Sequence, residues 1–254
     1  MSLPLRSYDS EDYVPSVLEP KVSVVIPTLN EAKNLPFVLP EIPAWVHEVI
    51  IVDGRSTDNT VEVAKSLLDN VRIVLEERKG KGAALSAGFN AAEGDIIVML
   101  DADGSMAPQE IGGYVRMLRD GADFVKGSRF LQGAGTTDME FYRRWGNTGF
   151  TVMVNLLFNA KYNDLCYGYS AFWKRTLPYL ALDATGFEVE TMMNIRALKA
   201  GLKVYEAPSF EAPRIHGTSN LRTIPDGFRV LRTIFQEWFK GKSYIPSSIL
   251  LQNS

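Results

Sequence analysis

The 254-residue chain has one cysteine, Cys166, and two histidines. A single cysteine excludes an intrachain disulfide framework and any cysteine-rich zinc site. No stretch reaches the roughly 18 uninterrupted apolar residues of a membrane-spanning helix. A net charge of −3 argues against a general nucleic-acid-binding protein. We therefore expect a cytoplasmic protein without a nucleic-acid partner, which at most lies peripherally on the cytoplasmic face of a membrane.

The composition is that of an ordinary globular protein, with 46% hydrophobic and 22% charged residues. The length suits one large domain with a small appendage. Residues 1–20 are polar, acidic and contain proline, which predicts a flexible leader and no signal peptide. We expect the main domain over residues 21–220 and a C-terminal amphipathic helix and tail over 221–254.

The first hundred residues alternate between short apolar runs and amphipathic segments. Several of the apolar runs end in loops that carry Asp or Gly, and Pro27 is expected to stop the first of them. This alternation predicts parallel βαβ units. The expected strands are 22–26, 48–52, 71–75 and 95–100, and the expected helices are 59–69 and 81–92.

The second half is more mixed. Apolar residues at helical spacing form one stripe over 226–239, and the run 150–158 is almost as apolar. Both segments carry arginines nearby, which also suits a membrane interface, but we expect them to pack in the core. The expected helices are 107–119, 141–158, 189–199 and 226–239, and the strands are 123–126, 169–173 and 203–206; the stripe comprises Phe228, Leu231, Ile234, Phe235 and Trp238.

The most informative stretch is the apolar run 97–100, which ends in Asp101-Ala102-Asp103. Charges at the carboxyl end of a buried strand lie where open α/β sheets hold their ligands. Two adjacent carboxylates repel each other unless a cation lies beside them, and Mg²⁺ or Mn²⁺ prefers carboxylate and phosphate oxygens. The alternative is a solvated turn after a strand.

Three other loops hold polar residues in the expected first half. Residues 27–31 (Pro-Thr-Leu-Asn-Glu) and 53–58 (Asp-Gly-Arg-Ser-Thr-Asp) follow the first two strands. Asp53 is suited to accept hydrogen bonds from a nucleobase or ribose. Residues 79–82 (Lys-Gly-Lys-Gly) precede a helix, where amides and the helix dipole attract phosphate. Each loop is also explained as a turn or helix cap.

Together these motifs resemble the inverting nucleotide-sugar glycosyltransferases of family 2, on the GT-A fold. Within that family the chain is most similar to the dolichyl- and polyprenyl-phosphate mannose or glucose synthases. The resemblance covers residues 20–220. It implies an α/β fold with a Rossmann-like nucleotide-binding half, a mostly parallel central sheet flanked by helices, and a mixed C-terminal acceptor half. Similar segments stand at 22–31, 52–58, 79–82, 101–103, 127–130, 164–168 and 213–219.

The resemblance also implies which residues hold the donor. Asp101 and Asp103 would bind Mg²⁺ or Mn²⁺ against the sugar diphosphate. The resemblance also implies that Asp103 is a catalytic residue. His216 is either a third metal ligand or a surface loop histidine. The GDP- or UDP-linked donor would meet Pro27, Leu29, Glu31, Asp53, Ser56, Lys81, Asp101 and Ala102.

On the acceptor side the resemblance implies phosphate binding by Arg129, Arg214 and Ser219, with Arg129 also counted as catalytic. A hydroxyl acceptor needs a general base, for which Glu188 and Glu190 are the candidates. With polyprenyl phosphate these carboxylates would orient the sugar or the metal site. Asn220 and Ser170 stand where those synthases usually carry a cation, which leaves the acceptor open.

We therefore predict a metal-dependent inverting transferase that moves a hexose from a GDP-mannose- or UDP-glucose-type donor to polyprenyl phosphate, with possible membrane contact. A soluble or polysaccharide hydroxyl is the alternative acceptor. A sugar nucleotidyltransferase is less favoured, because residues 27–31 do not form an early Gly-rich loop with Arg and Lys. A non-catalytic nucleotide-sugar-binding protein is the third alternative, and the oligomeric state stays open.

Overall fold

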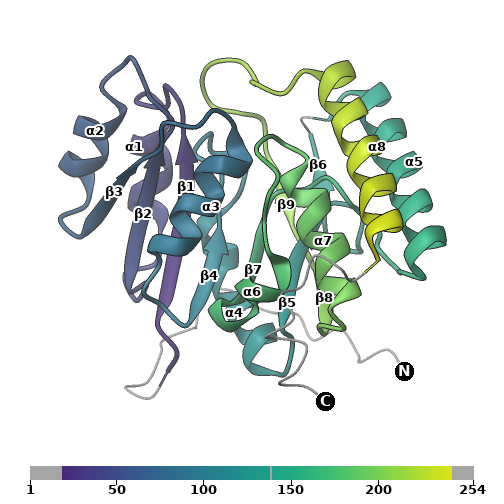
Figure 1. Ribbon diagram of the computed structural model, residues 1–254. Helices are drawn as coiled ribbons and strands as arrows, with labels where there is room; N and C mark the ends of the chain where they lie inside the picture. The colour runs from purple at the N-terminus through teal and green to yellow at the C-terminus, as the bar shows by residue number, and fades with distance from the viewer. Residues whose placement is uncertain (1–18, 138, 242–254) are drawn as a thin grey trace.

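The computed structural model describes residues 19–137 and 139–241, which form a central sheet with helices on both faces (Figure 1). Most of the expected leader and the tail after Gly241 lie outside the described residues. The division of the chain at residues 20 and 220 stays a prediction. None of the described helices is long and apolar enough to cross a membrane.

Seven strands form the main sheet in the order β3-β2-β1-β4-β7-β5-β8. Only β7 runs antiparallel to its neighbours, so the mostly parallel sheet predicted from the sequence is confirmed. All seven predicted strands are present, with shifted ends: β1 Val22–Thr28, β2 Glu48–Asp53, β3 Val71–Leu75, β4 Ile96–Met99, β5 Phe124–Ser128, β7 Ser170–Trp173 and β8 Val204–Pro208.

The first strand does not stop at Pro27, as the sequence had suggested. β1 continues to Thr28, and Pro27 is paired in register with Val52 of β2. The backbone carbonyl of Val25 points toward β4, where it accepts the Leu100 amide at 3.1 Å. The backbone nitrogen of Pro27, two residues further, points toward the same neighbouring strand, but the pairing of β1 with β4 has already ended at Met99. Its missing N–H therefore costs no hydrogen bond of the sheet.

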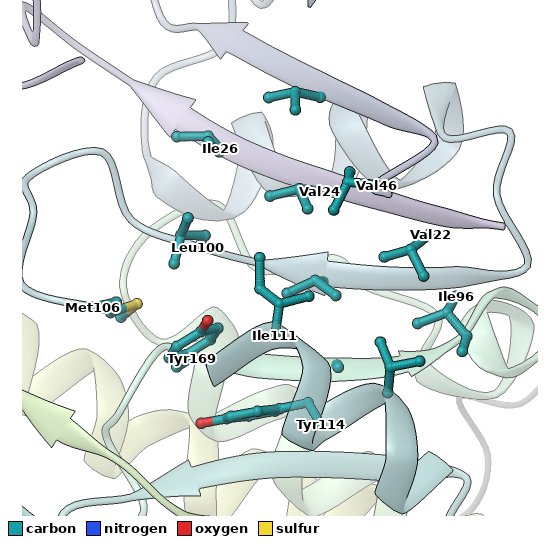
Figure 2. Packing of buried hydrophobic residues seen from close by; sticks show 14 of the residues in the cluster. Val22, Val24, Ile26, Val46, Ile96, Leu100, Met106, Ile111, Tyr114 and Tyr169 are labelled. Atoms are coloured by element: carbon teal, nitrogen blue, oxygen red, sulfur yellow. The ribbon is translucent and has the colours of Figure 1, made fainter. Parts of the chain in front are cut away.

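One face of the sheet is covered by helix α4 (Ile111–Arg119), together with the short α1 (Leu35–Val38) and α2 (Thr60–Leu67). Figure 2 shows Ile111 and Tyr114 of α4 directed at the sheet, near Leu100 and Tyr169. The rings of Tyr114 and Tyr169 stack with centroids 4.6 Å apart. Leu100, which directly follows β4, belongs to the same buried cluster as these residues of α4.

The opposite face is covered by α3 (Lys81–Ala91), α6 (Leu177–Leu180) and α7 (Val189–Lys199). Gly88 of α3 lies so close to the sheet that a Cβ there would be 2.4 Å from Val25 Cγ1. Glycine therefore lets α3 approach β1 and carries Lys81, at the helix start, to the carboxyl edge of the sheet. Short elements that the sequence did not reveal include η2 (Leu39–Glu41), η3 (Pro108–Glu110), η4 (Lys174–Thr176) and a two-stranded pair, β6 (Gly135–Thr136) with β9 (Phe210–Glu211).

Two long helices, α5 (Phe141–Phe158) and α8 (Thr223–Lys240), lie side by side at the β8 end of the sheet (Figure 1). They share a small core with α7, into which Val154, Val230 and Ile234 pack. Arg196 of α7 and Glu237 of α8, both almost fully buried, join these helices through a 2.7 Å ion pair.

The predicted core stripe of the C-terminal helix is wrong for three of its members. Phe228, Phe235 and Trp238 are 68%, 40% and 45% exposed, and Ile234 is buried. The buried face of α8 instead includes Val230 and the charged Glu237. Pairing with Arg196 makes burial of Glu237 possible and turns the aromatic residues outward. Hydrophobicity alone did not predict this rotation of the helix.

Candidate active site

A cleft of about 570 Å³ opens at the carboxyl edge of the sheet. It is lined by the loops after β1, β4 and β5, by the start of α3, by the segment before β7 and by the chain between β9 and α8. Parallel strands deliver their carboxyl ends to the same edge. The sequence-predicted residues that line it are Pro27, Leu29, Glu31, Lys81, Asp101, Ala102, Asp103, Arg129, Glu190, Arg214 and Ser219.

Lys81 links two carboxylates in the wall of this cleft. Its Nζ lies 2.7 Å from Asp101 Oδ1 and 2.7 Å from Glu190 Oε1. Burial alone would lower the pKa of Lys81, but the two carboxylates raise it above its ordinary value. Lys81 therefore keeps its charge and holds Asp101 in a fixed position.

Arg214 makes a similar bridge between Glu31 and Asp103. Its Nη1 lies 2.9 Å from Glu31 Oε1, and its Nη2 lies 3.0 Å from Asp103 Oδ2. The other oxygen of Asp103, Oδ1, accepts hydrogen bonds from the amide and hydroxyl of Ser105, at 3.0 and 2.6 Å. The loop after β9 is thus tied to the loops after β1 and β4.

Arg129, which follows β5, is held by carboxylates on both sides. Asp164 accepts from its Nε at 2.7 Å and from its Nη2 at 3.0 Å, and Glu211 accepts from its Nη1 at 3.1 Å. Asp164 is fully buried and also accepts a bond from Asn147 at 2.9 Å. Arg129 therefore uses its guanidinium to fix the wall of the cleft.

Hydrogen bonds tie the loops after β1 and β2 together. The Asn30 amide donates to Ser56 Oγ at 2.9 Å, and the Thr57 amide donates to Asn30 Oδ1 at 2.7 Å. Asp53 Oδ2 accepts the Arg55 and Ser56 amides. Its Oδ1 is buried, without a hydrogen-bond partner among the described residues.

A model of the family described as glycosyl transferase family 2 matches residues 23–178. The chain belongs to glycosyl transferase family 2. The prediction made from the ordered motifs is therefore confirmed, and it now rests on a match that spans more than half of the chain.

This family 2 chain is similar to two curated relatives and to one solved structure. A dolichol-phosphate mannosyltransferase of Pyrococcus furiosus is 32% identical over 85% of the chain, which spans 63% of that protein's length. A polyprenol monophosphomannose synthase of Mycolicibacterium smegmatis is 28% identical, with 94% of this chain and 95% of that protein covered.

The solved structure is glucosyl-3-phosphoglycerate synthase from Mycobacterium tuberculosis, in complex with Mn²⁺, UDP and phosphoglyceric acid. It matches with a TM-score of 0.68 at 22% identity, covering 86% of this chain and 78% of that one. At that identity the likeness shows the fold alone, and it confirms the predicted GT-A architecture.

Not every predicted site residue of the family 2 chain reaches the cleft. The His216 ring lies against Phe37, with centroids 5.6 Å apart, and borders a neighbouring cavity. No three His, Cys, Asp or Glu side chains among the described residues are grouped to hold a metal. The structure therefore brings Asp101 and Asp103 together but does not add His216 to them.

The two candidate bases have different surroundings. Glu190 lines the cleft and is paired with Lys81. Glu188 is turned to its own loop, where its Oε1 accepts the Gly186 amide at 3.0 Å. Asp53 and Ser56 do not line the cleft themselves, although the adjacent Gly54 does.

The glycines at the start of α3 have a packing role that the sequence did not reveal. A Cβ at Gly80, whose φ is +108°, would lie 2.2 Å from the Thr185 carbonyl oxygen, and one at Gly82 would lie 2.4 Å from that of Ala184. The Ala83 amide donates to Thr185. The glycines let the helix start touch this backbone, and phosphate binding by its amides stays a prediction.

Several residues of the cleft wall were missed from the sequence, among them Arg143, Tyr167 and Cys166. Arg143, at the start of α5, lines the cleft and has no carboxylate within ion-pair distance in the described part of the chain. Tyr167 packs its ring 4.8 Å from the Arg129 guanidinium. Burial raises the pKa of the Cys166 thiol to about 12, so this thiol is uncharged at neutral pH.

Proposed function

We propose that this chain is a metal-dependent, inverting glycosyltransferase that moves a hexose from a GDP- or UDP-linked donor to a polyprenyl phosphate. The observation that carries the proposal is the placement of Asp101 and Asp103 in one cleft at the carboxyl edge of the sheet. Two relatives named for transfer to dolichol or polyprenol phosphate support the acceptor class. The Mn²⁺ and UDP named for the solved structural neighbour support the donor class.

The residues present fit a divalent cation. Asp101 and Asp103 offer hard oxygen ligands, and Mg²⁺ is commonly held by one or two carboxylates together with substrate phosphates. A third protein ligand is not needed for such a site. When bound, Mg²⁺ or Mn²⁺ would act as a Lewis acid that stabilises the charge on the departing nucleoside diphosphate.

The donor nucleoside is assigned to the end of the cleft formed by Pro27, Thr28 and Leu29. Gly54, which directly follows Asp53, lines the same cleft. Its amide donates to the Thr28 carbonyl at 2.9 Å, which joins the ends of β1 and β2 at this place. Asp101 and Asp103 lie further along the same cleft, where the diphosphate would follow.

The ion pairs and hydrogen bonds of the cleft carboxylates favour a phosphate acceptor over a hydroxyl acceptor. A hydroxyl acceptor needs a free general base, whereas a phosphate monoester is already ionised near neutral pH. Every described carboxylate that lines the cleft is engaged by a cation or hydroxyl of the chain: Glu31 and Asp103 by Arg214, Asp101 and Glu190 by Lys81, Glu211 by Arg129, and Glu140 by Tyr142.

Arg143 is the residue we assign to the acceptor phosphate. Arg129 already meets Asp164 and Glu211, and Arg214 meets Glu31 and Asp103. Arg143 lines the cleft without such a partner among the described residues. An arginine offers several N–H donors to a phosphate.

A membrane surface beside the cleft would present the lipid part of the acceptor. Exposed apolar residues stand at the same spacing on both long helices, namely Phe141, Trp145, Val152 and Leu156 on α5 and Ile224, Phe228, Phe235 and Phe239 on α8. We name these eight residues the exposed stripes. Arg144, Arg229, Arg232 and Lys240 lie on the same helices. Apolar side chains among cations suit an anionic lipid surface.

A binding screen followed by product analysis tests the proposal. GDP- and UDP-sugars with Mn²⁺ are first ranked by the shift in melting temperature, because a bound ligand stabilises the fold by mass action. The selected donor is then incubated with polyprenyl phosphate. Glycolipid and an equal amount of nucleoside diphosphate are expected. Pyrophosphate release from a nucleoside triphosphate would instead identify a nucleotidyltransferase, and no turnover would favour a binding protein.

A further inference from the structure

The four carboxylate oxygens of Asp101 and Asp103 are already bonded to groups of the chain itself. Lys81 Nζ lies 2.7 Å from Asp101 Oδ1 and 2.9 Å from Oδ2. Arg214 lies 3.0 Å from Asp103 Oδ2, and Ser105 donates two bonds to Oδ1. A divalent cation that coordinates these oxygens must therefore share them with Lys81, Arg214 and Ser105.

The two cations are held in place from behind by further carboxylates. Glu190 binds Lys81 at 2.7 Å, and Glu31 binds Arg214 at 2.9 Å. The backbone around Arg214 is fixed as well, since the Ile215 amide donates to the Asp103 carbonyl at 3.1 Å and the His216 amide donates to Asn34 Oδ1 at 2.9 Å. Lys81 and Arg214 therefore stay close to any cation that binds Asp101 and Asp103.

A cation that enters alone would meet two like charges at contact range, and such repulsion is strong in a partly buried site. A nucleoside diphosphate changes this balance, because its phosphate oxygens can accept hydrogen bonds from a guanidinium and an ammonium. The same oxygens would complete the coordination of the cation. The anion thus relieves the competition that the cation alone would meet.

We propose that Lys81 and Arg214 are internal counterions that couple the two ligands, so that the site takes up a divalent cation together with a nucleoside diphosphate and binds the cation alone weakly. The proposal rests on the proposed function, since it assumes that Asp101 and Asp103 are the metal ligands. It assigns Lys81 and Arg214 a role in binding order.

Binding of Mn²⁺, followed by electron paramagnetic resonance, measures this coupling directly. GDP or UDP, whichever the thermal screen selects, should tighten Mn²⁺ binding by at least about tenfold, within the usual range of coupling between sites. By linkage, Mn²⁺ must tighten nucleotide binding by the same factor. Equal Mn²⁺ affinity with and without nucleotide would overturn the proposal, and this measurement needs no variant.

Two variants separate competition from a general charge effect. Arg214→Gln should bind Mn²⁺ alone several-fold more tightly and show a reduced coupling factor. Glu31→Gln/Arg214→Gln keeps the net charge of the parent and should also bind Mn²⁺ alone more tightly, because Asp103 Oδ2 is released. Tightening in the single variant only would contradict competition. Arg175→Gln, whose parent side chain is 61% exposed and does not line the cleft, is the matched control and should leave Mn²⁺ binding unchanged.

The outcomes also distinguish this proposal from the proposed function. If no nucleoside diphosphate binds with Mn²⁺ at all, the proposed function fails and the coupling fails with it. If nucleotide and Mn²⁺ bind independently and sugar transfer still occurs, only the counterion role of Lys81 and Arg214 is overturned.

Discussion

Arg129 and Asp164 form a bidentate ion pair at the wall of the cleft. The Arg129 Nε lies 2.7 Å from Asp164 Oδ2, and the Arg129 Nη2 lies 3.0 Å from Asp164 Oδ1. Both residues are buried. Two parallel hydrogen bonds of this kind fix orientation as well as distance. The pair links the end of β5 to the segment before β7, so it supports the wall of the cleft to which Arg129 belongs.

Asp164→Asn should therefore act mainly on stability. The change leaves Arg129 buried with half of its partners, and breaking a buried pair in this way costs about 3–5 kcal/mol. Urea unfolding of the variant checks this value. Asp123→Asn, which breaks the exposed pair with Arg175 at 3.4 Å, should cost less than about 1 kcal/mol. An Asp164→Asn protein as stable as its parent would contradict a supporting role for the pair.

The pH dependence of unfolding follows from the same residue. Burial raises the pKa of Asp164, but the hydrogen bonds and charge of Arg129 outweigh it and hold the pKa below the ordinary 3.8. The unfolded chain therefore takes up this proton first as the pH falls. The contribution of ionised Asp164 to the free energy of unfolding is complete above the pKa of the unfolded chain. It is lost as the pH falls through the lower pKa of the folded protein.

The free energy of unfolding, measured between pH 6 and pH 3, should thus decrease below about pH 4. Glu237 titrates in the same direction, because hydrogen bonds and charges from Arg196 and Lys199 outweigh the effect of burial on its pKa. Asp164→Asn should show a shallower decrease than the parent. An identical slope in the two proteins would mean that Asp164 is not held ionised by Arg129.

Arg143→Gln should raise the KM for a polyprenyl phosphate acceptor by about tenfold, while the KM for the nucleotide-sugar stays unchanged. The expected size corresponds to one charge-assisted hydrogen bond, roughly 1.5 kcal/mol. Arg144→Gln is the matched control, because Arg144 lies next in the same helix but stacks over Phe130 at 5.2 Å and does not line the cleft. Equal effects of the two substitutions would remove Arg143 from the acceptor site.

The exposed stripes predict binding to anionic lipid. Leu156 and Phe239 are 79% and 78% exposed, and each would gain about 1.5–3 kcal/mol on full burial. Leu156→Ser/Phe239→Ser should lower co-sedimentation with phosphatidylglycerol vesicles by tenfold or more. Leu75→Ser, on the far edge strand β3 and 72% exposed, should leave it unchanged. A second copy of the chain as occupant of the stripes would instead appear as a dimer that the double variant dissociates.

The sequence predicted the strands well because periodicity reports burial directly. The run before Asp101 is apolar on both faces, since β4 lies inside the sheet with helices on each side. The same signal could not orient α8, where a buried ion pair between Arg196 and Glu237 decides which face is covered. The periodicity of one segment does not show a charge partner that is distant along the chain.

In the site, too, local motifs could be read from the sequence, whereas contacts between distant segments could not. Asp101, Asp103, Lys81 and Arg214 were named from local motifs, and the structure brings them into one cleft. Their pairing with Glu190 and Glu31 depends on how the loops close over the sheet edge. His216 was named from its position in a loop, but its ring lies tilted against Phe37 and borders a neighbouring cavity. Arg143 was considered from the sequence only for membrane contact, and the geometry revealed its place in the cleft.

Sugar transfer itself tests the central claim most directly. The donor selected by the thermal screen, labelled in its sugar, is incubated with polyprenyl phosphate and Mn²⁺, and glycolipid and nucleoside diphosphate are both quantified. The parent and Asp123→Asn should form the two products in equal amounts. Asp103→Asn, or excess chelator, should abolish both while the variant keeps its fold. Full transfer by Asp103→Asn, or undiminished transfer in chelator, would contradict the account.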